Sequence, residues 1–179
     1  MTRITPVMPE EAKGEVKEIY EKIQKKTGTV FNIYQLMGNS PATLGGYLAL
    51  GEMAKKASLS PQLCEKIALA VSEENQCHYC LAAHTAVAKM LGVEMPVTLR
   101  ARKGMSDDPK VEAILKFAKH VVEVRGNVTD SDVAELKNTG VNNQELVEII
   151  LVVIQTMFSN YFNHIVETEV DFPEAPELE

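Results

Sequence analysis

The sequence lacks any excess of basic residues, because 18 lysines and arginines stand against 25 aspartates and glutamates, for a formal net charge of -7. Nucleic-acid binding requires a basic surface that neutralises phosphates, so this composition argues against DNA or RNA as a partner. The N-terminus has no apolar stretch behind a basic start, and the longest apolar run, LVEIILVVIQTMF, is interrupted by Glu148 and Gln155. We therefore expect no secretory signal and no membrane span, and we expect the protein in the cytoplasm.

Cysteine is also scarce, with three residues in a chain of 179. So few cysteines, and an odd number of them, do not suit a fold held by disulfides. In a reducing cytoplasm a Cys-x-x-Cys pair indicates redox or metal chemistry before a structural role. The share of hydrophobic residues is 45% and that of charged residues 24%, which is typical of a globular protein with a core. The length fits one domain over residues 1–179.

Helix start and stop signals dominate the chain, and no run alternates with period two between turn signals. Ser-Pro or Asp-Pro pairs at 40–41, 60–61 and 108–109 predict helix starts, and glycines predict helix ends. The expected helices cover 9–27, 41–57, 61–75, 78–91, 109–125, 130–139 and most of 142–170. The fold is therefore predicted to be all-α, with a largely buried last helix and an extended acidic tail at 171–179.

The stretch EENQCHYCLAAHTA, residues 73–86, holds the densest group of reactive side chains. Cys77 and Cys80 are three residues apart, and His84 follows four residues later. A helix that starts near His78 places these three side chains on one face. The exposed N–H groups and positive dipole end of a helix N-terminus favour thiolate over thiol, and His84 can accept a proton from Cys80. The spacing thus indicates a redox-active CxxC pair beside a base.

Acidic residues flank this stretch in two ways. Glu65 lies on the preceding expected helix, twelve residues before Cys77. If the two helices pack antiparallel, Glu65 comes level with His84, where a carboxylate would orient the imidazole and stabilise its cationic form. Glu73 and Glu74 would instead disfavour a thiolate at Cys77 unless they point to solvent.

Glu65, the CHYC segment and His84 together resemble the active-site pattern of AhpD-like alkylhydroperoxidases in the carboxymuconolactone decarboxylase superfamily. The close match covers about residues 59–92, and the ending NYFNHIVETEVDFP is similar to the last helix and tail of that family. A lone CxxC is a weak signal, whereas an acid, a CxxC and a histidine at these spacings are more specific. The resemblance implies an all-helical bundle with the CxxC at the N-terminus of a core helix. It also implies homo-oligomers, often trimers or hexamers.

The same resemblance implies a thiol-dependent peroxidase or disulfide oxidoreductase with an antioxidant role. Cys80 would attack the peroxide or disulfide substrate, and Cys77 would resolve the sulfenic acid to a disulfide. His84 and Glu65 would form the proton relay. No bound cofactor is implied. An external dithiol, such as a lipoyl protein or a thioredoxin-like donor, would reduce the disulfide, and a peroxiredoxin is a further candidate partner.

Tyr79 departs from the family pattern, because the best-known AhpD proteins have a histidine directly before the second cysteine. Tyrosine is a poor base near neutral pH, so the expected relay is shorter here. We expect Tyr79 to line the pocket rather than to transfer protons. Decarboxylation of a lactone, from which the superfamily takes its name, is not associated with a CxxC pair and is the less favoured activity.

Other interpretations of the cysteines remain open at this point. Cys77, Cys80, His84 and Glu65 could bind zinc, although structural zinc sites usually have a second CxxC or a histidine pair. A redox-sensing module without turnover is another alternative. The plainest is packing of small buried residues, which is the role we expect for Cys64.

The chain also contains an internal echo. Glu145 precedes His164 by nineteen residues, the interval that separates the acid and the histidine of the motif. This second segment has Met157 and Asn160 at the places of the two cysteines. Either an old duplication or chance would explain the echo.

Overall fold

The computed structural model describes residues 2–178, and within them the chain is all-helical, as the sequence predicts. Residue 179, the end of the expected tail, lies outside the described residues. The helices are α1 (Gly14–Thr27), α2 (Asn32–Met37), α3 (Pro41–Ala54), α4 (Pro61–Glu74), α5 (His78–Met90), α6 (Met95–Arg102), α7 (Pro109–Glu123), α8 (Asp130–Asn138) and α9 (Asn143–Val166).

Side-chain caps account for most of these boundaries. Ser40 and Ser60 each accept a hydrogen bond from the N–H three residues later, at the starts of α3 and α4. Asp108 caps α7 in the same way, and capping boxes open α8 and α9. Each cap satisfies a donor that a helix N-terminus leaves unpaired, so the predicted starts of these helices are confirmed.

The predicted start of the first helix is wrong. Pro9 lies in a turn, and α1 begins five residues later at Gly14, which has φ +55°. This left-handed conformation is accessible to glycine at little cost and interrupts any helix that would start earlier. The sequence pattern also missed two short helices, α2 and α6, which have few residues over which a periodicity can be recognised.

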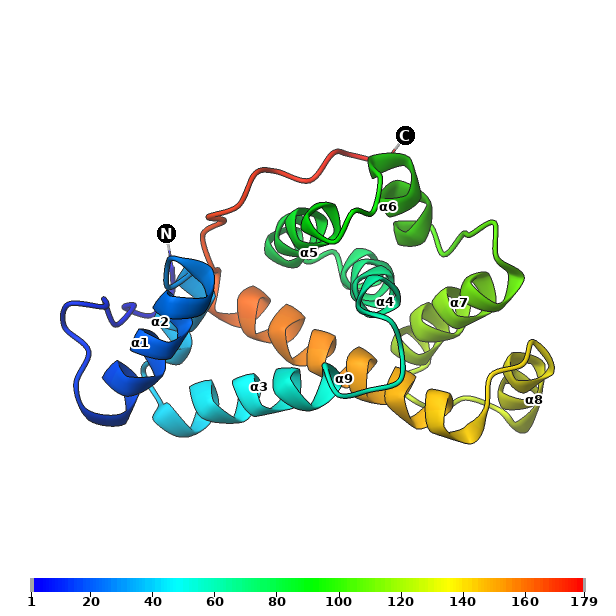
Figure 1. Ribbon diagram of the computed structural model, residues 1–179, viewed down its shortest axis with the longest axis horizontal. Helices are drawn as coiled ribbons and strands as arrows, with labels where there is room; N and C mark the ends of the chain where they lie inside the picture. Colours follow the sequence, from blue (N-terminus) through cyan, green and yellow to red (C-terminus); the bar gives the residue numbers. More distant parts are fainter. Residues whose placement is uncertain (1, 179) are drawn as a thin grey trace.

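Two helices, the long α9 and α4, organise the molecule. Helix α9 runs through the middle, from α8 at one end to α1 and α2 at the other (Figure 1). Helix α4 contacts α5, α6, α7 and α9, and α3 packs along α9. The antiparallel arrangement of α4 and α5 that the motif requires is produced by the tight turn at residues 75–77.

The core has two main parts. The larger part lies between α4, α7 and α9, and includes the fully buried Ile67, Leu115 and Ile149. The smaller part joins α1, α2 and α3 to the start of α5, and it contains both cysteines of the CxxC pair. The CxxC pair therefore lies in the smaller core, close to the N-terminal helices.

Helix α9, expected to be largely buried, is exposed along one face. One face is buried, and the opposite face carries an exposed apolar stripe of Val147, Ile150, Ile154, Phe158, Tyr161 and Ile165. By length and composition alone α9 could cross a membrane, but 44% of its most apolar window is buried inside the protein. The buried face also carries asparagines that bond to other helices, as in the core helix of a globular domain.

Residues 167–178, which follow α9, contain no helix and cross the molecule as a strap. It leaves the end of α9, passes α5 and reaches α6 (Figure 1). Asp171 accepts a hydrogen bond from the Asn32 N–H at 2.7 Å, and Phe172 stacks on Phe31 with ring centroids 4.4 Å apart. Near its end, the Pro176 carbonyl accepts from the buried guanidinium of Arg102. The strap thus connects the smaller core to α6.

Candidate active site

The site begins at the turn that separates α4 from α5. Gln76 adopts a left-handed conformation with φ +55°, and the Cys77 N–H donates to the Ser72 carbonyl at 2.9 Å. The side chain of Asn160, from α9, donates to Ser72 Oγ at 3.2 Å and accepts from Asn75 Nδ2 at 2.8 Å. This network fixes the turn and with it the entry into the helix that carries the cysteines.

Cys77 and Cys80 form a disulfide, with their Cα atoms 5.3 Å apart. Cys77 is the N-cap of α5, and its sulfur accepts from the Cys80 N–H at 3.4 Å. Only 1% of Cys77 and 2% of Cys80 is exposed. The CxxC pair therefore forms at a helix N-terminus, and a reactant can reach it only from within the protein.

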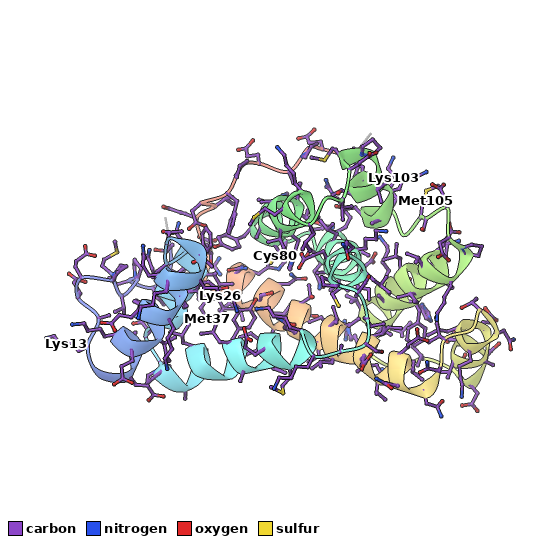
Figure 2. The ribbon with its side chains drawn as sticks, viewed as in Figure 1. Lys13, Lys26, Met37, Cys80, Lys103 and Met105 are labelled. Carbon is purple, nitrogen blue, oxygen red and sulfur yellow. A yellow bond between two sulfur atoms is a disulfide. The ribbon has the colours of Figure 1, made fainter. Side chains whose placement is uncertain are left out.

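Asn163 contacts the disulfide from α9. Its Nδ2 lies 3.2 Å from Cys80 Sγ and 4.0 Å from Cys77 Sγ, and the residue is 4% exposed. Figure 2 shows Cys80 below α5, between that helix and α9. The amide of Asn163 therefore donates to a sulfur of the pair, a contact that the CxxC motif alone does not predict.

Glu65 and His84 meet across the α4–α5 hairpin. Glu65 Oε2 lies 2.7 Å from His84 Nδ1, and the two side chains are 19% and 24% exposed. A carboxylate accepts hydrogen bonds, so Nδ1 carries the proton in this contact and Nε2 is left as the ring nitrogen that can take up another. The antiparallel pairing of acid and histidine inferred from the spacing is present.

A cavity of about 340 Å³ lies between α3, α4, α5 and α9, and the Glu65–His84 pair lines it together with apolar side chains and Tyr47. Ser159 lines its inner wall, on the buried face of α9. On α9, Asn163 lies four residues, or one helical turn, after Ser159. On α5, Cys80 lies four residues before His84. The cavity therefore ends one turn from the Cys80–Asn163 contact, which makes it the natural route to the sulfur.

Two further groups in the cavity have shifted titration. Burial raises the pKa of the Tyr47 hydroxyl, and the nearby Glu65 carboxylate raises it further. Burial, with the charges of Glu65 and Glu148, raises the pKa of the Cys64 thiol to about 11. Cys64 packs against the larger core, as expected, but it also lines the cavity, which the sequence did not indicate.

Tyr79 does not line this cavity, so that expectation is wrong. It is 5% exposed and points to the other side of α5, where its hydroxyl accepts from the Ile33 N–H at 3.4 Å. Its ring meets Phe172 edge to face, with centroids 5.7 Å apart. Burial and the Asp171 carboxylate raise its pKa, so Tyr79 packs the smaller core under the strap. The reason is helical: Tyr79 directly precedes Cys80 and is rotated about 100° from it.

The acids before the CxxC pair are neutralised. Glu73 pairs with Arg102 at 2.7 Å, and Glu74 pairs with Lys119 at 3.1 Å. Neither therefore stands as an unpaired negative charge beside Cys77. Among residues 2–178, no group of three or more histidine, cysteine or acidic side chains is arranged to hold a metal ion.

The internal echo is not a structural repeat. Glu145 and His164 lie on the same uninterrupted helix, α9, so nineteen residues separate them by about 28 Å. Glu145 belongs to the capping box of α9 and pairs with Lys110 at 2.7 Å, while His164 is exposed. The structure therefore gives no support to a duplication.

The sequence interpretation missed Tyr47, Asn160 and Asn163. The asparagines had a detectable signal, because two amides three residues apart interrupt an apolar helix in which asparagine is disfavoured. Buried polar side chains in such a helix have partners elsewhere in the fold. Tyr47 had no such signal, since its position depends on how α3 packs along α9.

Comparisons with known proteins agree with this description. Residues 41–120 match the carboxymuconolactone decarboxylase family. This match, together with the similar solved structures given next, confirms the resemblance inferred from the acid, CxxC and histidine pattern. A search of the curated proteins finds no match.

Solved structures share the whole fold. One is an uncharacterized peroxidase-related protein with an alkylhydroperoxidase AhpD core from Ralstonia eutropha JMP134, with a TM-score of 0.85 and 20% identity over 95% of this chain and 92% of that one. A second peroxidase-related protein, from Silicibacter sp. TM1040, has a TM-score of 0.84 and 22% identity over 94% and 91%. The debrominase Bmp8, solved as a variant in complex with 2,3,4-tribromopyrrole, has a TM-score of 0.80 and 18% identity over 96% and 92%. At these identities the likeness establishes the fold.

Proposed function

We propose that this chain, whose residues 41–120 match the carboxymuconolactone decarboxylase family, is a thiol-dependent peroxidase that reduces organic hydroperoxides through Cys77 and Cys80. The observation that carries this proposal is the Cys77–Cys80 disulfide, which lies one helical turn from the Glu65–His84 pair. That pair lines a cavity. The disulfide is the oxidised state that such a cycle produces.

The proposed cycle starts from the reduced pair. The Cys80 thiolate attacks the terminal oxygen of a hydroperoxide; an S–O bond forms, the O–O bond breaks and the alkoxide leaves with a proton as an alcohol. His84 Nε2 takes the thiol proton and returns it to the leaving oxygen, while Glu65 holds Nδ1 and stabilises the imidazolium. Cys77 then attacks the sulfenic sulfur, so the S–S bond forms and water leaves.

The cavity supports an organic rather than an inorganic peroxide. Its volume of about 340 Å³ is far larger than hydrogen peroxide needs, and apolar side chains form most of its wall. An alkyl or aryl group in the cavity directs its peroxide group toward His84 and Cys80. This substrate class also fits the location we propose, a reducing cytoplasm in which a dithiol is available.

Completion of the cycle requires two electrons from an external dithiol, for which a lipoyl protein or a thioredoxin-like protein is suitable. The dithiol forms a mixed disulfide with one cysteine and then closes its own disulfide, which returns both thiols. If a disulfide substrate takes the place of the peroxide and oxidises the reduced pair, the activity is that of a disulfide oxidoreductase. No bound cofactor takes part in the proposed cycle.

The test is consumption of cumene hydroperoxide with dihydrolipoamide as reductant, in the wild type and in Cys80→Ser. We expect turnover in the wild type and none above background in Cys80→Ser, because the attacking sulfur is absent. The matched control is Cys64→Ser, which removes a thiol whose pKa of about 11 keeps it protonated. Turnover that survives Cys80→Ser, or that depends on Cys64 instead, would refute the proposal.

A non-catalytic alternative makes a different prediction. If the thiols serve only as a sensor or bind zinc, the wild type does not turn over hydroperoxide, and the reduced protein retains zinc in proportion to its concentration. The debrominase with the same fold shows that related proteins carry out other chemistry. A halogenated aromatic substrate is therefore a useful second substrate in the same assay.

We also propose that the protein is a homo-oligomer, a trimer or hexamer, which assembles through the apolar stripe of α9. The stripe extends from Val147 to Ile165 at helical spacing and borders the cavity, which Gln155 and Ser159 of the same helix line. A contiguous exposed apolar surface of this kind is typical of an interface. A second copy on it would also restrict solvent access to the cavity.

Light scattering tests this assembly. We expect a mass of at least three chains for the wild type and a shift toward the monomer in Ile154→Glu, which places a charge in the middle of the stripe. The control is Glu135→Lys on α8, an exposed position away from the stripe. A monomeric wild type would rule the assembly out.

A further inference from the structure

The two sulfurs of the disulfide have different hydrogen-bond donors. Cys77 Sγ accepts from the Cys80 backbone N–H at 3.4 Å, because Cys77 is the cap of α5. Cys80 Sγ accepts from the side-chain amide of Asn163 at 3.2 Å, and the same nitrogen is 4.0 Å from Cys77 Sγ. The amide therefore acts mainly on Cys80.

The helix N-terminus by itself favours the other cysteine. A cap residue lies closest to the unpaired N–H groups and to the positive end of the helix dipole, so Cys77 gains most from them. Cys80 lies one turn inside α5, where this effect has declined. If Cys80 is the attacking thiol, the helix terminus does not explain it, and beside the base His84 the sulfur needs a hydrogen-bond donor of its own.

The surroundings of Asn163 make its amide a strong donor. The residue is 4% exposed, and a hydrogen bond to an ionised group at low polarity is about twice as strong as a neutral one. The acids on the neighbouring elements are engaged elsewhere, and His84 keeps only Nε2 for the proton of Cys80. Glu65 binds His84 and Glu73 binds Arg102. Tyr79, on α5, is directed toward Ile33 on α2, and the nearest histidine on α9, His164, is exposed.

The other end of the amide also points to a role in the reaction. Asn163 Oδ1 is buried and has no hydrogen-bond partner among the described residues. An unpaired buried carbonyl is destabilising, so a purely structural role would be better served by an apolar side chain. During the cycle, the sulfenic acid at Cys80 brings an O–H donor to the sulfur that the same side chain contacts.

We propose that the side-chain amide of Asn163 stabilises the thiolate of Cys80 and thereby makes Cys80, rather than Cys77, the attacking thiol. The inference rests on the proposed peroxidase function and adds a catalytic residue from α9 to a site otherwise built from α4 and α5. The amide hydrogen-bonds to the sulfur at which the S–O bond forms.

The test is a titration of each thiol alone, in reduced protein. Cys77→Ser leaves Cys80 and Cys80→Ser leaves Cys77; the thiolate is followed by its ultraviolet absorbance. Cys64 does not interfere below about pH 9, because its pKa is about 11. Each background is compared with Asn163, with Asn163→Leu and with Asn163→Asp.

We expect Asn163→Leu to raise the pKa of Cys80 by about one unit, a tenfold loss of thiolate at neutral pH, and that of Cys77 by less than about 0.3 unit. Asn163→Asp should raise the pKa of Cys80 further, because a carboxylate replaces the donor. Equal shifts at both thiols, or no shift at Cys80, would overturn the proposal. If Asn163→Leu does not fold, the nearly isosteric Asn163→Asp decides the question alone.

A stability measurement separates this role from a structural one. Asn163→Leu removes the unpaired carbonyl, so we expect its Tm to be equal to or above that of the wild type. Asn160→Ala serves as the matched variant from the same face of α9, because Asn160 holds Ser72 and Asn75 but neither sulfur. It should lower Tm and preserve the pKa difference between the thiols.

The titration also distinguishes this inference from the proposed function. A wild type that fails to reduce hydroperoxide, but in which Asn163 controls the pKa of Cys80, would reject the peroxidase and retain the role of Asn163. If the wild type reduces hydroperoxide but the pKa of Cys80 does not change on replacement of Asn163, the peroxidase is retained and the role of Asn163 is rejected.

Discussion

Two segments of this chain share the interval between a glutamate and a histidine, and only one of them forms a site. In the α4–α5 hairpin, Glu65 and His84 come within 2.7 Å of each other. In α9, Glu145 and His164 have the same separation in sequence and lie about 28 Å apart. The difference is the turn at Gln76, which reverses the chain in the first segment and has no counterpart in the second. A spacing becomes a site only when the chain between its ends folds back.

The largest effect should come from replacing the two histidines in turn. His84→Asn should reduce hydroperoxide turnover by about 10²–10⁴-fold, because the reaction loses its general acid and base. His164→Asn should leave turnover within about twofold, because His164 is exposed at the end of α9. Steady-state rates with cumene hydroperoxide measure both. Similar losses of turnover in the two variants would mean that the histidine of the hairpin has no particular role in the reaction.

A glycine should have opposite effects on stability at the turn of the hairpin and at the equivalent position of α9. Gln76→Gly should raise the free energy of unfolding by up to about 1 kcal/mol, since glycine adopts φ +55° without strain. Thr156→Gly, at the equivalent place in α9, should lower it by at least about 1 kcal/mol, because glycine weakens a helix interior. Urea denaturation of both variants gives the comparison. A loss of stability in Gln76→Gly would show that the turn does not depend on the left-handed residue.

The two glutamates should separate activity from stability. Glu145→Ala removes a capping box and the Lys110 ion pair, so it should cost about 1 kcal/mol, or about 2–4 °C in Tm, at neutral pH. The hydrogen bond from Lys110 lowers the pKa of Glu145, so this stabilisation is complete above its ordinary pKa of 4.5 and is lost as the pH falls below it. Thermal melts at several pH values should show the gap closing in acid.

Glu65→Gln is the matched variant in the hairpin. It keeps the size of the side chain but removes the charge that stabilises the His84 imidazolium, so it should lower turnover while changing Tm by less than Glu145→Ala does. We assign Glu65 to activity and Glu145 to stability. Full turnover in Glu65→Gln would contradict this assignment, and so would lost turnover with an unchanged Tm in Glu145→Ala.

The smallest effect concerns the third thiol. Cys64 lines the cavity beside Glu65, but burial raises its pKa to about 11. In the disulfide form we therefore expect almost no alkylation by iodoacetamide at neutral pH, and labelling that increases only in alkali. Mass spectrometry counts the labelled thiols. Rapid labelling of Cys64 at neutral pH would show that the hairpin has a further reactive cysteine, whereas α9 has none.

The sequence was sufficient for the fold class and for the α4–α5 hairpin, and the reasons are physical. Caps such as Ser60 act within a few residues, so their effect can be read locally. The meeting of Glu65 with His84 follows from two short antiparallel helices. The contacts of Asn163 and Tyr79 depend instead on how distant segments pack, namely α9 and the strap, and local spacing contains no information about that packing. The late start of α1 also could not be read from Pro9, since the left-handed Gly14 decides it.

Burial of the disulfide has a kinetic consequence. Thiol–disulfide exchange requires the incoming thiolate to approach one sulfur in line with the S–S bond, yet the cysteines are 1% and 2% exposed. In the proposed function a small hydroperoxide would enter through the cavity, whereas a dithiol carried by another protein would reach the sulfurs only if the chain opened locally. The strap, held by Asp171 and Phe172, packs on Tyr79 beside Cys80, so its release would loosen the packing around the start of α5. The rate of reduction by a protein donor should then follow the free energy of that local opening, as hydrogen exchange does.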